Sequence, residues 1–176
     1  FRVLGSSVMP TEGIFDLTST TGIPANFQNV FLYGLDGWDG FPNKRRELVD
    51  FLKTSAIPAT LFVSGDIHGG FVSQLGGDTS VSLTTPAISS GTLQESVQAA
   101  AIGLGFAIDT PGYNKVVANL DQTLRDSNPA IQFTAPDQHG FVIVELGPTE
   151  AQATFHLISQ SEVKTDSTGL DTAALA

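Results

Sequence analysis

The sequence of 176 residues lacks cysteine altogether, which excludes disulfide bonds within the chain. Basic residues are scarce as well: 8 Lys and Arg stand against 18 Asp and Glu, and the net charge is −10. A surface of that sign repels polyanions, so we expect no binding to nucleic acid. Long apolar runs are also absent, and no stretch approaches the roughly 20 residues that a helix needs to cross a bilayer. The sequence therefore predicts no transmembrane segment.

Charged residues make up only 15% of the chain, whereas hydrophobic residues make up 41%. The apolar fraction is sufficient for one domain-sized core. A low charge content with abundant Ser, Thr, Gly and Ala is more typical of proteins outside the cytoplasm than of cytosolic ones. The composition thus favours an extracytoplasmic location.

The stretch LFVSGDIHGG, residues 61–70, is an apolar run that stops at a Gly-rich turn. This pattern predicts a buried strand that delivers Asp66 and His68 to a loop at its carboxyl end, where α/β sheets keep their chemistry. If the chain stays extended, the two side chains leave the same face and could form a metal-binding or acid/base pair. Alternatively, Asp66 caps a turn and His68 is an ordinary loop histidine.

Residues 34–59, just before this strand, combine a Gly- and Asp-rich loop with a helical pattern. Pro42 provides a helix start, and the pattern breaks between residues 55 and 58. Loop, helix and strand in this order are typical of α/β layers. The predicted helix is amphipathic, and its apolar positions are Leu48, Val49, Phe51 and Leu52.

The rest of the chain alternates between further predicted elements. Residues 113–128 have helical apolar spacing, but either a helix or an exposed insertion would fit them. Gly147-Pro148 predicts a turn, and therefore a hairpin, between the last two strands. From Lys164 onward no periodic apolar face remains, which predicts a flexible tail over 164–176. The other expected elements are a strand at 81–88, a helix at 93–106, and strands at 131–135, 139–146 and 153–159.

The residues Trp38-Asp39-Gly40-Phe41-Pro42 precede a predicted basic helix, and a strand that ends in SGDIH follows it. This pattern resembles the carboxyl-terminal half of the PhoD-like alkaline phosphatase/phosphodiesterase family. Three further stretches agree in the same order: residues 2–9, 82–93 and the run from Asn128 to ATFHLI. The resemblance implies an α/β fold, the carboxyl-terminal lobe of a two-layered metallophosphatase-type sandwich with a mixed sheet and flanking helices. Residues 1–163 would belong to that domain.

By this resemblance the chain is part of a metal-dependent phosphoric mono- or diester hydrolase that is periplasmic, cell-surface or secreted. The metal centre of the family is built from both halves of a longer polypeptide, and the amino-terminal half supplies Cys, Tyr, Asp and Asn ligands. The chain starts at Phe1 and has its single Met at position 9. We therefore expect it to act on a phosphate ester only together with an amino-terminal half, in the same or a separate chain.

The resemblance also assigns expected roles to single residues. Asp66 is the first candidate for a metal ligand, because a carboxylate suits the Ca²⁺ and Fe³⁺ that the family implies. His68 would either ligate the metal or act catalytically by hydrogen bonding to a phosphate oxygen or leaving group. Asp39 and Trp38 would lie at the rim of the active site in a supporting or substrate-facing role. Apart from the resemblance, the position of Lys44, Arg45 and Arg46 in the first turns of a solvated helix predicts an exposed face, with acidic neighbours that offset the helix dipole. His139, in a turn, and His156, in a strand, are expected to be structural or surface residues.

Two departures from the family pattern keep a second interpretation open. Gly69-Gly70 follows His68 where the family more often has Ser and an aromatic residue, and Ala130 replaces the His of an Asn-Pro-His sequence. The chain could then be a non-catalytic binding or structural subunit derived from the same fold. Metal ligands on an amino-terminal half would discriminate between the two interpretations.

Overall fold

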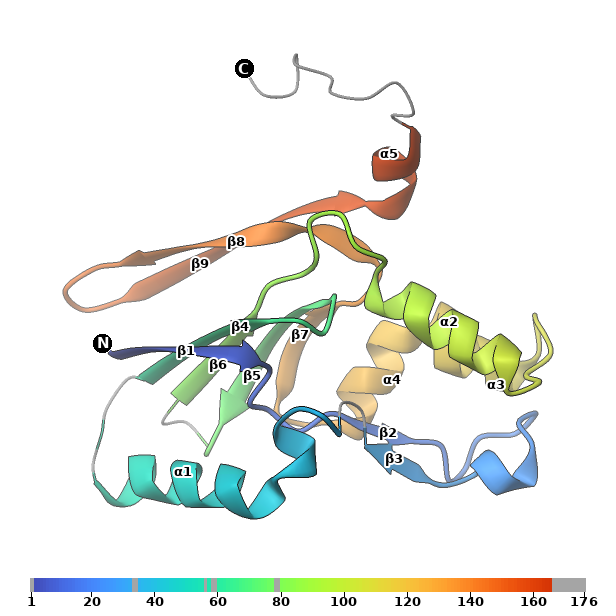
Figure 1. Ribbon diagram of the computed structural model, residues 1–176, viewed down its shortest axis with the longest axis horizontal. Coiled ribbons are helices and arrows are strands. Elements are labelled where there is room, and N and C mark those ends of the chain that lie inside the picture. Colours follow the sequence, from blue (N-terminus) through green and yellow to red (C-terminus); the bar gives the residue numbers. More distant parts are fainter. Residues whose placement is uncertain (1, 33–34, 56, 58–59, 78–79, 166–176) are drawn as a thin grey trace.

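The computed structural model describes residues 2–32, 35–55, 57, 60–77 and 80–165. Its centre is a five-stranded sheet in the order β1-β4-β6-β5-β7 (Figure 1). β1 pairs with β4, and β4 with β6, in parallel, whereas β5 is antiparallel to both β6 and β7. The sheet is therefore mixed, as predicted. The strands are β1 (Arg2–Val8), β4 (Thr60–Gly65), β5 (Gly70–Leu75), β6 (Ser80–Thr84) and β7 (Ile131–Ala135).

Helix α1 (Pro42–Thr54) covers one face of the sheet at the end near β4. Pro42 occupies the first turn, where its missing N–H costs nothing, so the helix begins where the sequence predicts. Leu52 packs with Phe62 of β4 and Leu75 of β5 in a small apolar cluster. Phe51 also belongs to the predicted stripe, but its side chain is 57% exposed.

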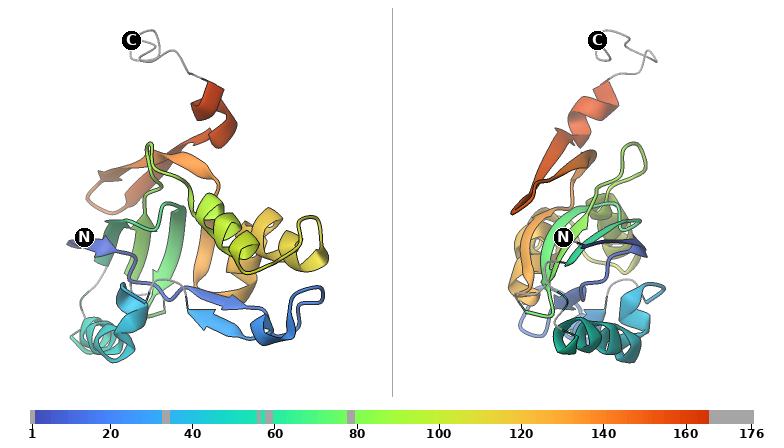
Figure 2. Two further views of the ribbon diagram at one scale, coloured as in Figure 1. Left: turned by 45° about the vertical axis from the view of Figure 1, so that its right-hand side comes forward. Right: turned by 90° about the vertical axis from the view of Figure 1, so that its left-hand side faces the viewer.

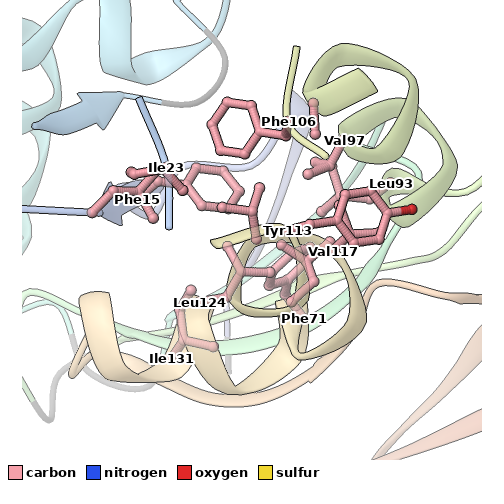
Figure 3. Close-up of a cluster of buried hydrophobic side chains, with 14 of the residues drawn as sticks. Phe15, Ile23, Phe71, Leu93, Val97, Phe106, Tyr113, Val117, Leu124 and Ile131 are labelled. Carbon is pink, nitrogen blue, oxygen red and sulfur yellow. The ribbon is translucent and has the colours of Figure 1, made fainter. Parts of the chain in front are cut away.

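The main core lies under a second group of helices (Figure 3). These are α2 (Leu93–Gly103), α3 (Pro111–Tyr113), the π-helix η3 (Asn114–Ala118) and α4 (Leu120–Ser127). Thr92 and Glu95 form a reciprocal capping box that starts α2. Residues 113–128 are thus packed helices rather than an exposed insertion, because Val117, Leu120 and Leu124 are buried in this core.

A short antiparallel pair, β2 (Ile14–Asp16) and β3 (Val30–Leu32), flanks these helices, with a single 3₁₀ turn, η1 (Ala25–Phe27), between its strands. Asn128, at the end of α4, ties β2 to the helices. Its side-chain oxygen accepts a hydrogen bond from Ile14 N at 2.8 Å, and its amide nitrogen donates to Ile14 O at 2.8 Å and Leu124 O at 2.7 Å. Asn128, the Asn of the Asn-Pro pair, therefore has a structural role in this chain: it holds β2 against the end of α4.

The hairpin of β8 (Gln138–Leu146) and β9 (Ala151–Ser159) lies on the side of the sheet opposite α1 (Figures 1 and 2). Gly147 N donates to Glu150 O at 2.8 Å in the connecting turn, which confirms the predicted hairpin. The Phe155 ring meets Phe133 of β7 with 5.1 Å between ring centroids. α5 (Gln160–Thr165) follows, and residues 166–176 of the predicted tail lie outside the described part. Among the described residues, no helix is long and apolar enough to span a membrane.

Candidate active site

A hollow of about 640 Å³ opens where the parallel strands β1 and β4 end. Three segments line it: residues 8, 9 and 11 at the end of β1, the turn at 35–39, and residues 65–67 at the end of β4. The carboxyl ends of parallel strands are the usual position for ligand sites in α/β sheets. Three acidic residues, Asp36, Asp39 and Asp66, line this hollow. None of its lining residues is basic, within the part of the chain that the structure describes.

The loop after β4 does not continue the extended backbone of the strand. Asp66 has φ 72° and His68 has φ 61°, both in the left-handed region that residues other than glycine rarely adopt. Ile67 N donates to Gly65 O at 2.9 Å and tightens the turn. The condition for a shared face, an extended chain, is therefore not met. Asp66 lines the hollow, whereas His68 is not among its lining residues.

His68 instead turns toward the segment that joins β6 to α2. Its Nδ1 lies 2.7 Å from the carbonyl oxygen of Gly91. Since a carbonyl can only accept, Nδ1 carries the hydrogen, and Nε2 of the neutral ring holds the free lone pair. A backbone carbonyl bound to one ring nitrogen is the usual way in which proteins orient a histidine whose other nitrogen binds a metal or moves a proton.

Asp39 is buried, and its carboxylate is occupied by groups of the chain itself. One oxygen lies 2.6 Å from Nη1 of Arg45, and the other accepts a hydrogen bond from Gly13 N at 3.0 Å. Burial raises the pKa of Asp39 above its ordinary value, and the Gly13 N–H and the Arg45 guanidinium act in the opposite direction. Asp39 thus connects the turn at 35–39 to the segment after β1 and to α1.

Arg45 extends this network, because its Nη2 lies 3.0 Å from Oε1 of Glu12. Its side chain is only 14% exposed, so the prediction of an exposed basic face is wrong at this position. The predicted acidic neighbours are confirmed, since Asp39 and Glu12 flank the guanidinium. Lys44 does point to solvent, where it pairs with Glu47 at 2.7 Å.

Trp38, in the 3₁₀ turn η2 (Trp38–Gly40), fixes the same turn to β1. Its indole Nε1 donates to Ser6 Oγ at 3.2 Å, and Ser6 Oγ donates to Val8 O at 2.6 Å. Asp36 sits at the exposed end of this turn and lines the hollow together with Asp66. Asp36 was not predicted as a site residue; its position in the same Gly- and Asp-rich loop as Asp39 was the available signal.

The two remaining histidines lie on the β8–β9 hairpin. His139 is the second residue of β8 rather than part of a turn, and it is buried with Nε2 3.0 Å from Ser90 O. The prediction placed it in a turn because Asp137-Gln138 precedes it, but its backbone pairs with Ile158. His156 is exposed on β9, and its ring stacks on Phe141 with 4.9 Å between centroids.

Gly69 and Ala130 are two of the positions that depart from the family pattern, and the structure shows what each contacts. A side chain at position 69 would place its Cβ 3.0 Å from the Phe71 ring, so glycine avoids a tight contact there. Ala130 precedes β7, and its carbonyl accepts a hydrogen bond from Gln74 N at 2.8 Å. Ala130 therefore extends the sheet through its backbone.

Hard oxygen donors suit Ca²⁺ and Fe³⁺, and Asp36 and Asp66 offer two carboxylates to the hollow. In the described ranges, no group of three or more His, Cys, Asp or Glu residues is placed to hold a metal ion. The described residues thus bring two carboxylates to the hollow and no complete set of metal ligands. Any complete centre would need further donors.

Comparisons with known proteins agree on one family. A family model described as PhoD-like phosphatase matches residues 1–155. Alkaline phosphatase D of Bacillus subtilis (strain 168) is 27% identical over 127 residues, which are 72% of this chain and 20% of the relative. The solved structure of PhoD matches with a TM-score of 0.56 and 16% identity, over 91% of this chain and 28% of that one. The chain therefore spans well under half the length of both relatives, and at this identity the structural match shows the fold alone.

Proposed function

Since this chain belongs to the PhoD-like phosphatase family, we propose that it is the carboxyl-terminal portion of a metal-dependent phosphoric ester hydrolase. The observation that carries the proposal is the Asp66 carboxylate in the hollow at the ends of β1 and β4, with Asp36 on the opposing turn. The substrate would be a phosphate monoester or diester. Activity would require the amino-terminal half, in the same or a separate chain.

The charge of the hollow supports metal dependence. A phosphate ester is an anion, and the acidic residues that line the hollow would repel it. Arg45 cannot compensate, because its guanidinium is engaged by Asp39 and Glu12. A bound cation would reverse this field and, when present, supply Lewis-acid polarisation of the phosphoryl oxygens and of a water molecule.

Each residue has a distinct role in this proposal. Asp66 and Asp36 hold the cation through hard carboxylate oxygens, and the amino-terminal half supplies the remaining ligands. Nε2 of His68 either joins that ligand set or hydrogen-bonds a phosphate oxygen or the leaving group. Asp39 acts as a support: it holds the turn that carries Asp36 against Gly13.

The proposal is tested by replacing Asp66 in the complete enzyme. Asp66→Asn keeps the size of the side chain but removes its charge, and turnover of p-nitrophenyl phosphate or bis(p-nitrophenyl) phosphate should fall on the order of 100-fold or more. Asp50→Asn, on the exposed face of α1, is the matched control and should leave turnover unchanged. The ratio of the two substrates also distinguishes monoesterase from diesterase activity.

Two results would overturn the proposal. One is full turnover by Asp66→Asn, which would remove this carboxylate from the site. The other is the absence of both hydrolysis and metal content when the amino-terminal half is present, which would favour the non-catalytic binding or structural subunit.

We also propose a periplasmic, cell-surface or secreted location, supported by the relation to alkaline phosphatase D and by the low charged fraction of 15%. Fractionation of the producing cells, with immunodetection of the protein, tests this directly. Recovery only from the cytoplasmic fraction would contradict it.

A further inference from the structure

Two histidines contact successive backbone carbonyl groups of the segment 85–92, which joins β6 to α2. His139 Nε2 lies 3.0 Å from the oxygen of Ser90, and His68 Nδ1 lies 2.7 Å from the oxygen of Gly91. The two histidines come from different parts of the fold, the loop after β4 and the start of β8. The contacts of buried His139 and of His68 are therefore only one peptide unit apart.

The start of β8 fixes this segment firmly. His139 is 3% exposed, and the next residue, Gly140, donates its N–H to Ala87 O at 3.0 Å. Figure 1 shows the segment rising beside β8 before it enters α2. Gly91 itself has no side chain to anchor it, and a glycine backbone is freer than any other. The Gly91 carbonyl shares its peptide group with Thr92 N, which donates to Glu95 Oε2 at 2.9 Å. The capping box therefore restrains Gly91 on one side, and the contact of His139 with Ser90 O restrains it on the other.

From this geometry we infer that His139 is a positioning residue for His68. By holding the Ser90 carbonyl, His139 restrains the Gly91 carbonyl that accepts from His68 Nδ1. That restraint keeps His68 in the tautomer with hydrogen on Nδ1 and the lone pair on Nε2. The inference rests on the proposed function for its consequence, since Nε2 of His68 is the atom assigned to the metal or the phosphate.

The full chain has three histidines, so ring tautomers can be read from two-bond ¹H–¹⁵N spectra of labelled protein at a pH where the rings are neutral. The wild-type spectrum should show His68 with hydrogen on Nδ1 and His139 with hydrogen on Nε2. His68→Asn assigns the first set of signals. The exposed His156 is the internal reference, and His156→Gln should leave the other two patterns unchanged.

Two substitutions at position 139 separate positioning from packing. His139→Gln places an amide nitrogen near the position of the ring Nε2 and should keep the Nδ1–H tautomer of His68. His139→Asn is too short to reach Ser90 O and should convert His68 to a mixture of tautomers. In the active complete enzyme, kcat should fall roughly 10-fold in the Asn variant with KM little changed, and the Gln variant should restore it.

The inference is overturned if wild-type His68 carries its hydrogen on Nε2, a result that needs no variant to fold. It is equally overturned if the Asn variant leaves the tautomer of His68 unchanged, or if Gln and Asn disturb it equally. The tautomer readout does not depend on turnover. Absence of hydrolysis with the expected tautomers would therefore refute the proposed function and leave the positioning of His68 in place.

Discussion

Replacing Arg45 by Met should destabilise the protein far more than a surface charge would suggest. The substitution keeps the aliphatic stem and removes the guanidinium that contacts Asp39 at 2.6 Å and Glu12 at 3.0 Å. The Asp39 side chain is only 5% exposed, so its carboxylate would remain buried and would keep the hydrogen bond from Gly13 N but lose the guanidinium. An uncompensated buried charge of this kind costs about 3–5 kcal/mol.

The lower end of that range is appropriate, because the Glu12 side chain is 49% exposed and contributes little to the energy. A loss of about 3 kcal/mol corresponds to a decrease in Tm of roughly 6–12 °C for a chain of this size. Urea and thermal unfolding measure it directly. Arg46→Met, one position further along α1 and exposed, is the matched control and should stay within about 0.5 kcal/mol of the wild type.

A second substitution tests the cause. In the Arg45→Met background, Asp39→Asn removes the buried charge while an amide oxygen can still accept from Gly13 N. The double variant should therefore be more stable than Arg45→Met alone. If Arg45→Met costs no more than Arg46→Met, or if Asp39→Asn gives no recovery, the ion pair does not stabilise the protein.

Two further predictions concern Asp39 and Asn128. Burial raises the pKa of Asp39, so the native state binds the carboxyl proton more tightly than the unfolded chain does. The stability of the wild type relative to Asp39→Asn should therefore fall as the pH rises from about 3.8 through the raised pKa. Urea unfolding over a pH series checks this, and a difference that rises with pH would mean that the pairing with Arg45 outweighs burial. Asn128→Ala removes three hydrogen bonds to Ile14 and Leu124 and should cost about 3 kcal/mol in thermal unfolding. Asn119→Ala, at an exposed position, is its control. Equal losses of stability in both variants would contradict the structural role of Asn128.

The sequence was a good guide to elements that depend on local pattern. The start of α1 at Pro42, the strand that ends before Asp66 and the β8–β9 hairpin all follow from side-chain spacing and turn residues within a few positions of each other. Asp66 was also found from the sequence as a candidate, because a carboxylate after an apolar strand is a local signal. The family could be identified for the same reason, since its motifs are short and retain their order along the chain.

Several features of the site depend on contacts between distant residues and could be decided only by the tertiary structure. Asp39 reaches Gly13 across 26 positions, and His68 reaches Gly91 across 23. No local pattern encodes such pairs. The contact of Arg45 with Glu12 is also between distant residues, and Arg45 was therefore misassigned to an exposed face. The left-handed backbone at Asp66 and His68 overrode the alternation expected of an extended chain. The sequence by itself thus determined most of the helices and strands and the family to which the chain belongs, although it did not predict β2, β3 or β5. Tertiary packing decided which polar groups are free to face the hollow, because burial and long-range pairing depend on the whole fold.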